Sequence, residues 1–214
     1  MQLYYITDRK QFPGGESAQR RQLLEKIAES AHYGIDYVQL REKDLTTHDL
    51  ELLARDAVAA RQPVNSRTKL LINSRTDVAM AVGADGVHLR GEDVSPEVVR
   101  AICCGVGALA RVIVAISCHS VDDVARAASR GADFCVFGPV FEKQGSTPSG
   151  LDALREVCHE KVPVLALGGV TLANTAACLS AGAAGIAGIR LFQDNDLSQL
   201  IPKLRAQRVA SSDV

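Results

Sequence analysis

The sequence lacks a long hydrophobic run, an excess of either charge and any Cys-x-x-Cys pair. Without an apolar run of about 18 residues, we expect no membrane-spanning helix. The opening residues MQLYYITDRK lack the basic and apolar regions of a secretory signal. The 24 basic and 25 acidic residues leave a net charge of −1, which offers no electrostatic patch for nucleic acid or an anionic membrane. We therefore expect a cytoplasmic protein that binds neither.

The cysteines lie inside apolar segments without the spacing of metal ligands. They are Cys103, Cys104, Cys118, Cys135, Cys158 and Cys178. This pattern favours buried, reduced thiols over a metal site or a disulfide framework.

Short apolar segments alternate with longer amphipathic segments eight times along the chain. The expected strands are 3–7, 37–40, 70–73, 86–89, 112–116, 134–137, 164–167 and 184–189. The expected helices are 17–33, 46–60, 76–82, 95–102, 121–129, 151–159, 172–180 and 197–206. A glycine followed by Ala or Ile stands at four helix-to-strand joints, which supports an internal repeat.

Eight strand–helix units in 214 residues predict an α/β fold, a single closed (β/α)₈ TIM barrel with parallel strands. A doubly wound open sheet more often has five or six strands and a Gly-x-Gly-x-x-Gly motif after the first. Here Thr7-Asp8-Arg9 follows the first strand instead. We expect the barrel to span residues 1–208 and residues 209–214 to form a flexible tail.

Polar or glycine-rich segments follow seven of the eight expected strands, at the rim where barrels of this kind hold their active sites. The candidate residues are Gln39, Arg41, Lys43, Asn73, Asp93, Ser117, His119, Lys143, Gly168, Gly169, Ile189 and Arg190. Other interpretations stay open: Gln39 and Arg41 suit ordinary strand positions, and Asn73 suits a helix cap. His119 suits a helix N-terminal turn.

The glycines after strands seven and eight predict a phosphate site, because backbone N–H groups can approach an anion closely there. Arg190 would add a charge-assisted hydrogen bond. Gly168-Gly169 could instead form only a tight turn. Asp93, with Glu92 beside it, is a candidate magnesium ligand, or the two carboxylates stabilise a helix N-terminus.

The order and spacing of several motifs, from about Leu3 to Phe192, resemble the thiamine-phosphate synthase/TenI superfamily. The motifs are Tyr5-Ile6-Thr7-Asp8, Gln39-Leu40-Arg41-Glu42-Lys43, Leu71-Ile72-Asn73, Gly83-Ala84-Asp85-Gly86-Val87-His88-Leu89, Ser117-Cys118-His119-Ser120, Gly131-Ala132-Asp133-Phe134, Phe137-Gly138-Pro139-Val140-Phe141 and Leu167-Gly168-Gly169-Val170.

The resemblance implies roles for the rim residues. In a synthase, Gln39, Lys43 and Asn73 would contact a hydroxymethylpyrimidine pyrophosphate, and Ser117 would lie near its pyrophosphate. Asp93 would bind Mg²⁺. Gly169 and the backbone at Ile189-Arg190 would hold a thiazole phosphate. In a TenI-like thiazole tautomerase, His119 would act as the acid/base.

Three departures from the family pattern concern the pyrophosphate half of the site more than the thiazole half. Ser74 stands where synthases usually carry a second magnesium-binding Asp. After Phe141 the loop reads Glu-Lys-Gln-Gly-Ser-Thr instead of Pro-Thr-x-Thr-Lys, and Lys143 stands in for the lysine. Arg190 replaces a small residue.

We favour a thiamine-phosphate synthase, a transferase that couples hydroxymethylpyrimidine pyrophosphate to thiazole phosphate and releases pyrophosphate. The alternatives are a tautomerase that uses His119, which is an isomerase and needs no metal, and a non-catalytic barrel that binds phosphorylated ligands. Each implies phosphorylated small molecules as partners, and a homo-oligomer stays open.

Overall fold

Eight parallel strands close into a barrel in chain order, and β1 pairs with β8. The computed structural model describes residues 1–61, 67–105, 112–142 and 147–210, with residues 208–210 described by backbone alone. The strands are β1 (Gln2–Ile6), β2 (Tyr37–Leu40), β3 (Lys69–Asn73), β4 (Gly86–Leu89), β5 (Ile113–Cys118), β6 (Phe134–Phe137), β7 (Val164–Ala166) and β8 (Gly185–Gly188). The predicted barrel is therefore confirmed.

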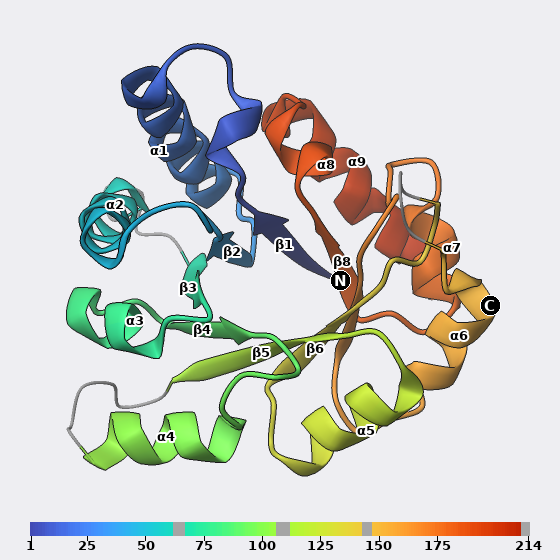
Figure 1. The fold of residues 1–214 in the computed structure, drawn as a ribbon. Helices are drawn as coiled ribbons and strands as arrows, with labels where there is room; N and C mark the ends of the chain where they lie inside the picture. The colour runs from blue at the N-terminus through green and yellow to red at the C-terminus, as the bar shows by residue number, and fades with distance from the viewer. Residues whose placement is uncertain (62–66, 106–111, 143–146, 211–214) are drawn as a thin grey trace.

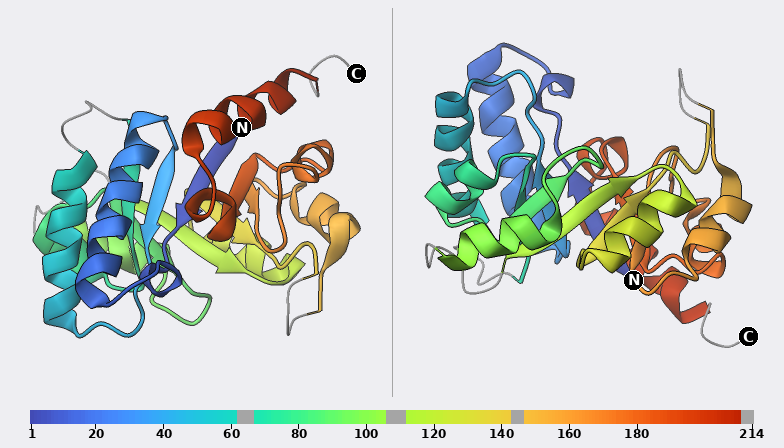
Figure 2. Two further views of the ribbon diagram at one scale, coloured as in Figure 1. Left: turned by 90° about the horizontal axis from the view of Figure 1, so that it is seen from above. Right: turned by 60° about the horizontal axis from the view of Figure 1, so that its bottom comes forward.

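Helices alternate with the strands and surround them as a ring (Figure 1). They are α1 (Glu16–His32), α2 (Thr47–Arg61), α3 (Thr76–Val82), α4 (Pro96–Gly105), α5 (Val121–Ser129), α6 (Gly150–Val157), α7 (Thr175–Ser180) and α9 (Leu197–Ala210). Figure 2 shows α9 beside the start of β1. There the Arg205 side chain donates hydrogen bonds to the Met1 and Gly34 carbonyls.

Two short elements were not predicted: the 3₁₀ helix η1 (Arg9–Gln11) and α8 (Arg190–Gln193). α7 also begins three residues later than predicted, because Asn174 holds a turn ahead of it. The Asn174 side chain accepts a hydrogen bond from the Thr171 amide and donates one to the Gly169 carbonyl. α9 runs to Ala210, beyond the predicted start of the tail. Residues 211–214 lie outside the described residues, so the tail stays a prediction.

Aromatic side chains dominate the inside of the barrel below the rim. Tyr4 and Phe134 are fully buried there, with ring centroids 5.4 Å apart in an edge-to-face contact. Tyr37 lies 4.7 Å from Phe134. Smaller aliphatic side chains complete this inner core: Ile6, Leu71, Ala115, Val136, Leu165 and Ala187. The barrel centre is therefore a packed floor rather than a pore.

The aspartates of the repeated helix-to-strand joints tie neighbouring strands together at the N-terminal end of the barrel. Asp36, Asp85 and Asp133 each accept a hydrogen bond from a backbone N–H of the preceding strand, at 2.8–2.9 Å. Each also pairs with an arginine from a helix: Arg205, Arg61 and Arg100, respectively. The repeat seen in the sequence is thus a structural device, located away from the rim.

All six cysteines are free, as predicted. The expectation that all are buried is wrong for Cys104, which is exposed on α4, and Cys158 is only half-buried. Among the described residues, no helix is both long and apolar enough to cross a membrane.

Candidate active site

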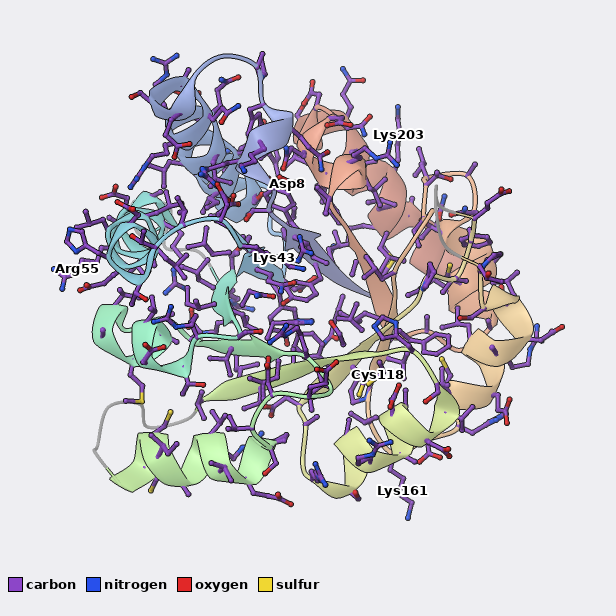
Figure 3. All side chains as sticks on the ribbon, in the orientation of Figure 1. Asp8, Lys43, Arg55, Cys118, Lys161 and Lys203 are labelled. Carbon is purple, nitrogen blue, oxygen red and sulfur yellow. The ribbon has the colours of Figure 1, made fainter. Side chains whose placement is uncertain are left out.

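The loop after β2 carries two cations at the C-terminal rim. Arg41 is half-buried and Lys43 is exposed. Figure 3 shows Lys43 inside the ring of helices, whereas Lys161 and Lys203 lie at the periphery. Within the described part of the chain, neither the Arg41 nor the Lys43 side chain has a hydrogen-bond or ion-pair partner. Two such cations are available to an external anion, and their contact with a phosphorylated ligand stays a prediction.

A third cation, Arg90 from the loop after β4, lies close to these two. The positive charge of Arg41, partial burial and the charge of Arg90 together lower the pKa of the Lys43 ammonium. We call Arg41, Lys43 and Arg90 the cation cluster. Like charges gather at a cost unless an anion joins them, so the cluster is suited to a ligand with more than one negative charge.

A buried ion pair beneath the cation cluster fixes the loop after β2, and the sequence did not reveal it. Glu42 points away from the rim and accepts hydrogen bonds from Thr7 Oγ1 at 2.6 Å and Arg9 Nη1 at 3.1 Å. The Arg9 and Glu42 side chains are only 3% and 1% exposed. Arg9 also pairs with Asp44 at 2.7 Å. The alternation of Arg41, Glu42 and Lys43 was the available signal, because adjacent residues of an extended segment face opposite ways.

Gln39 and Asn73 lie on neighbouring strands and bind each other. Gln39 Nε2 donates to Asn73 Oδ1 at 2.8 Å, and Gln39 is buried. The alternative that Asn73 caps α3 is wrong, because the N-cap residue is Arg75. This hydrogen bond orients both side-chain amides at the rim.

Asp93 is occupied by donors from the protein itself. Its Oδ2 accepts from Ser74 Oγ at 2.7 Å and from the Arg90 amide at 2.8 Å. Its Oδ1 accepts from Arg90 Nη2 at 3.0 Å. Burial raises the pKa of Asp93, but these hydrogen bonds outweigh burial and lower it below its ordinary value.

The predicted magnesium site at Asp93 does not fit this geometry. Glu92 is exposed, and no group of three or more His, Cys, Asp or Glu side chains in the described ranges could hold a metal ion. Ser74 supplies no second carboxylate, and it uses its hydroxyl to bind Asp93. A magnesium ion would have to displace Arg90 and Ser74 from the one carboxylate present.

Ser117 lies at the end of a buried hydrogen-bond chain with His88 and Tyr4. His88 Nδ1 is 2.9 Å from Tyr4 Oη, and His88 Nε2 is 2.8 Å from Ser117 Oγ. His88 is the only hydrogen-bond partner of the Tyr4 hydroxyl among the described residues. If Nδ1 were the donor, the buried Tyr4 proton would have no acceptor there, so we assign Tyr4 as the donor to Nδ1. Nε2–H then donates to Ser117 Oγ, and the serine proton is free to bind a ligand.

The surroundings of His88 in this hydrogen-bond network set its protonation state. Burial, followed by the charge of Arg41, lowers the pKa of His88 to about 3, so the ring is neutral at physiological pH. His88 is therefore a buried, hydrogen-bonded core histidine, and it orients Ser117.

His119 is exposed, and its imidazole is held in one orientation. Its Nδ1 is 2.6 Å from the carbonyl oxygen of Gly138, which can only accept, so Nδ1 carries the proton. In the neutral ring Nε2 is therefore an unprotonated base. The helix that follows is capped by Ser120 with Asp123 rather than by His119.

Gly168 and Gly169 present backbone amides at the other side of the rim. Both have left-handed φ, at 92° and 63°. Neither amide donates a hydrogen bond within the described residues, and nor does the amide of Ile189. The glycines also serve packing: an added Cβ would lie 2.5 Å from Pro139 Cα at Gly168, and 2.7 Å from Phe141 Cβ at Gly169.

Arg190 is exposed at the first position of α8, where it has no side-chain partner among the residues described. Lys143, the remaining catalytic candidate, lies outside the described residues. The fold therefore places four of the candidates after β2 and β3: Gln39, Arg41, Lys43 and Asn73. It places four others after β7 and β8: Gly168, Gly169, Ile189 and Arg190.

Comparison with known proteins agrees with this arrangement. A thiamine-phosphate synthase of Methanocella arvoryzae is 36% identical over 212 residues, which cover 95% of this chain and 93% of that protein. A thiamine-phosphate synthase of Clostridium novyi is 34% identical over 199 residues, 91% of each chain. A solved structure, thiamine phosphate pyrophosphorylase from Pyrococcus furiosus, has a TM-score of 0.80 and 28% identity, covering 98% of this chain and 96% of that one. Residues 3–192 match the family described as thiamine monophosphate synthase, and the chain belongs to that family.

Proposed function

We propose that this chain is a transferase that couples hydroxymethylpyrimidine pyrophosphate to thiazole phosphate and releases pyrophosphate. One observation carries the proposal: a single rim offers two anion-binding regions of different kinds. The Arg41 and Lys43 side chains have no ion-pair partner in the described part of the chain, and the amides of Gly168 and Gly169 have no acceptor there. Two phosphorylated substrates that must meet end to end require two such regions.

The residues present suit the charge changes of this reaction. The bond between the pyrimidine methylene carbon and the pyrophosphate oxygen breaks, and the pyrophosphate leaves with the electron pair. The thiazole nitrogen then supplies its lone pair to the same carbon, forming the new C–N bond. Arg41 and Lys43 stabilise the charge that develops on the leaving pyrophosphate, and the free Ser117 proton donates to it.

The remaining side chains position the substrates. The bound pair of Gln39 and Asn73 would hold the pyrimidine pyrophosphate, as the family resemblance implies. The amides at Gly168, Gly169 and Ile189 would hold the thiazole phosphate. Arg190 would add a charge at its edge, and Lys143 would contribute from the loop after β6. Family members generally depend on Mg²⁺, but the geometry around Asp93 gives no support for a resident ion, so no step is assigned to one.

A second activity, thiazole tautomerase, is favoured by the state of His119. Its Nε2 is an oriented base at the rim, which is the group that a proton shift on a thiazole requires. This activity needs only one phosphate site, however, whereas the rim offers two regions that suit phosphorylated groups. We therefore place it second. We retain a cytoplasmic location as a proposal, which the six free thiols support.

The deciding experiment is an assay with the two synthase substrates and, separately, with the tautomerase substrate. Thiamine phosphate formation by the wild-type protein, retained in His119→Ala, is expected. If the wild type forms no thiamine phosphate but shows tautomerase activity that His119→Ala abolishes, the second function replaces the first. Activity in neither assay would leave a barrel that only binds phosphorylated ligands.

A further inference from the structure

Arg90 and Asp93 form an ion pair inside the cation cluster. The Arg90 Nε and Nη2 atoms lie 3.3 and 3.0 Å from Asp93 Oδ1. The Asp93 side chain is 13% exposed, whereas that of Arg90 is 62% exposed. Nη1 makes no hydrogen bond within the described ranges. Asp93 therefore holds one edge of the guanidinium while another edge faces solvent.

The net charge of this pair equals that of a divalent ion together with the two carboxylates that bind it. A magnesium ion held by two carboxylates has no net charge. Asp93 with Arg90 has none either, because Ser74 at the neighbouring position is neutral. In both cases Arg41 and Lys43 remain in excess over the acidic groups. A pyrophosphate arriving at this rim would meet a similar total charge with or without the metal.

The pair also uses the atoms that a metal would need. Three groups donate to the Asp93 carboxylate: the Ser74 hydroxyl, the Arg90 amide and the Arg90 guanidinium. Magnesium dehydrates reluctantly and demands nearly ideal octahedral geometry. A single carboxylate whose two oxygens already accept hydrogen bonds is a poor ligand for magnesium.

We propose that Arg90, held by Asp93, takes the place of a divalent cation and binds a pyrophosphate group together with Arg41 and Lys43. A guanidinium suits this task, because its planar N–H groups match two phosphate oxygens at once. The Ser117 hydroxyl, which His88 orients, would donate its free proton to a further oxygen. The assignment of pyrophosphate as the ligand rests on the proposed function.

Calorimetric titration with inorganic pyrophosphate, in EDTA and then in excess Mg²⁺, tests this proposal. The wild type should bind in EDTA, and Mg²⁺ should change the dissociation constant by less than about tenfold, the equivalent of 1.4 kcal/mol. Arg90→Ala should weaken binding in EDTA by roughly 10- to 100-fold, as expected for hydrogen bonds to a charged group. Arg155→Ala is the matched control, because Arg155 is 55% exposed and pairs with Asp152 three residues away on the outer helix α6. It should bind like the wild type.

Two results would overturn the proposal: binding that requires Mg²⁺, or binding in EDTA that Arg90→Ala leaves unchanged. A parallel assay of thiamine phosphate formation separates this failure from failure of the proposed function. Catalysis with binding that depends on Mg²⁺ and not on Arg90 would contradict only the role of Arg90. Metal-free pyrophosphate binding through Arg90 without catalysis would contradict only the synthase.

Discussion

The two sides of the rim bind anions by different physical means. On the side formed by β2, β3 and β4, long cationic side chains supply the charge. Asp93 holds Arg90, and the pair of Arg9 and Glu42 holds the loop that carries Arg41 and Lys43. On the side formed by β7 and β8, backbone amides supply the donors, and left-handed glycines set their direction. We call these the side-chain half and the backbone half. A point mutation can remove a donor from the first, whereas any substitution other than proline can only displace one in the second.

The largest effect should come from the support of the side-chain half. Arg9→Met leaves the Glu42 carboxylate buried without its cation, and breaking a buried pair in this way costs about 3–5 kcal/mol. Chemical denaturation should show this loss of unfolding free energy. Glu51→Ala, which breaks the exposed pair with Arg55 on α2, should cost about 1 kcal/mol or less. Equal effects of the two variants would mean that the pair under the cation cluster does not hold the loop.

Lys43→Ala tests the charge of the side-chain half directly. Removing a group that stabilises developing negative charge should lower turnover by roughly 10²–10³. Lys161→Ala, a change to an exposed lysine at the periphery (Figure 3), is the control and should leave turnover unchanged. If both variants retain full activity in the synthase assay, the leaving pyrophosphate is not stabilised by Lys43.

His88, on β4 in the side-chain half, should make stability depend on pH. The pKa of His88 is lowered to about 3 in the folded protein, against about 6.5 when unfolded. The unfolded chain therefore binds the extra proton first, and this contribution to stability is complete above pH 6.5 and is lost as pH falls toward 3. Between pH 6.5 and pH 5 the loss from this group is about 2 kcal/mol.

Denaturation curves of the wild type and His88→Gln at these two pH values measure that contribution. Glutamine does not titrate, so the variant should show a correspondingly smaller loss of stability in acid. An identical pH dependence in the two proteins would show that the ring is not buried in its neutral form.

Arg190→Ala should have the smallest effect and thereby sharpens the comparison. If backbone amides hold the thiazole phosphate, removal of this exposed side chain should raise KM less than about tenfold, the equivalent of 1.4 kcal/mol. Steady-state kinetics with thiazole phosphate as the varied substrate give this value. A hundredfold rise would move phosphate binding from the backbone to the side chain and would make the two halves alike.

The fold and the membership of the rim followed from the sequence, because hydrophobic periodicity and the end of each strand are local properties. The side-chain partners of the rim residues were not predictable in the same way. The sequence indicated that Glu42 and Asp93 follow barrel strands. It did not indicate that Glu42 turns inward to Arg9 or that Arg90 and Ser74 hold Asp93. These pairings depend on the conformation of the loops, which decides which side chains meet. Hydrophobic periodicity carries no information about loop conformation. Asp93 consequently has the chemical type of a metal ligand, but its carboxylate is already bound by Ser74 and Arg90.

The aspartates at the opposite end of the barrel have a consequence for how such a chain can diverge. Asp36, Asp85 and Asp133 connect neighbouring strands by contacts that share no residue with the cation cluster or the glycines. Substitutions at the rim therefore leave these connections intact, and substitutions of the aspartates have little bearing on the specificity of the rim. Selection can thus alter the substrate or metal requirement of the barrel in steps that each remain folded. For protein engineering, the rim of this chain is a surface to redesign, and the aspartates are residues to leave unchanged.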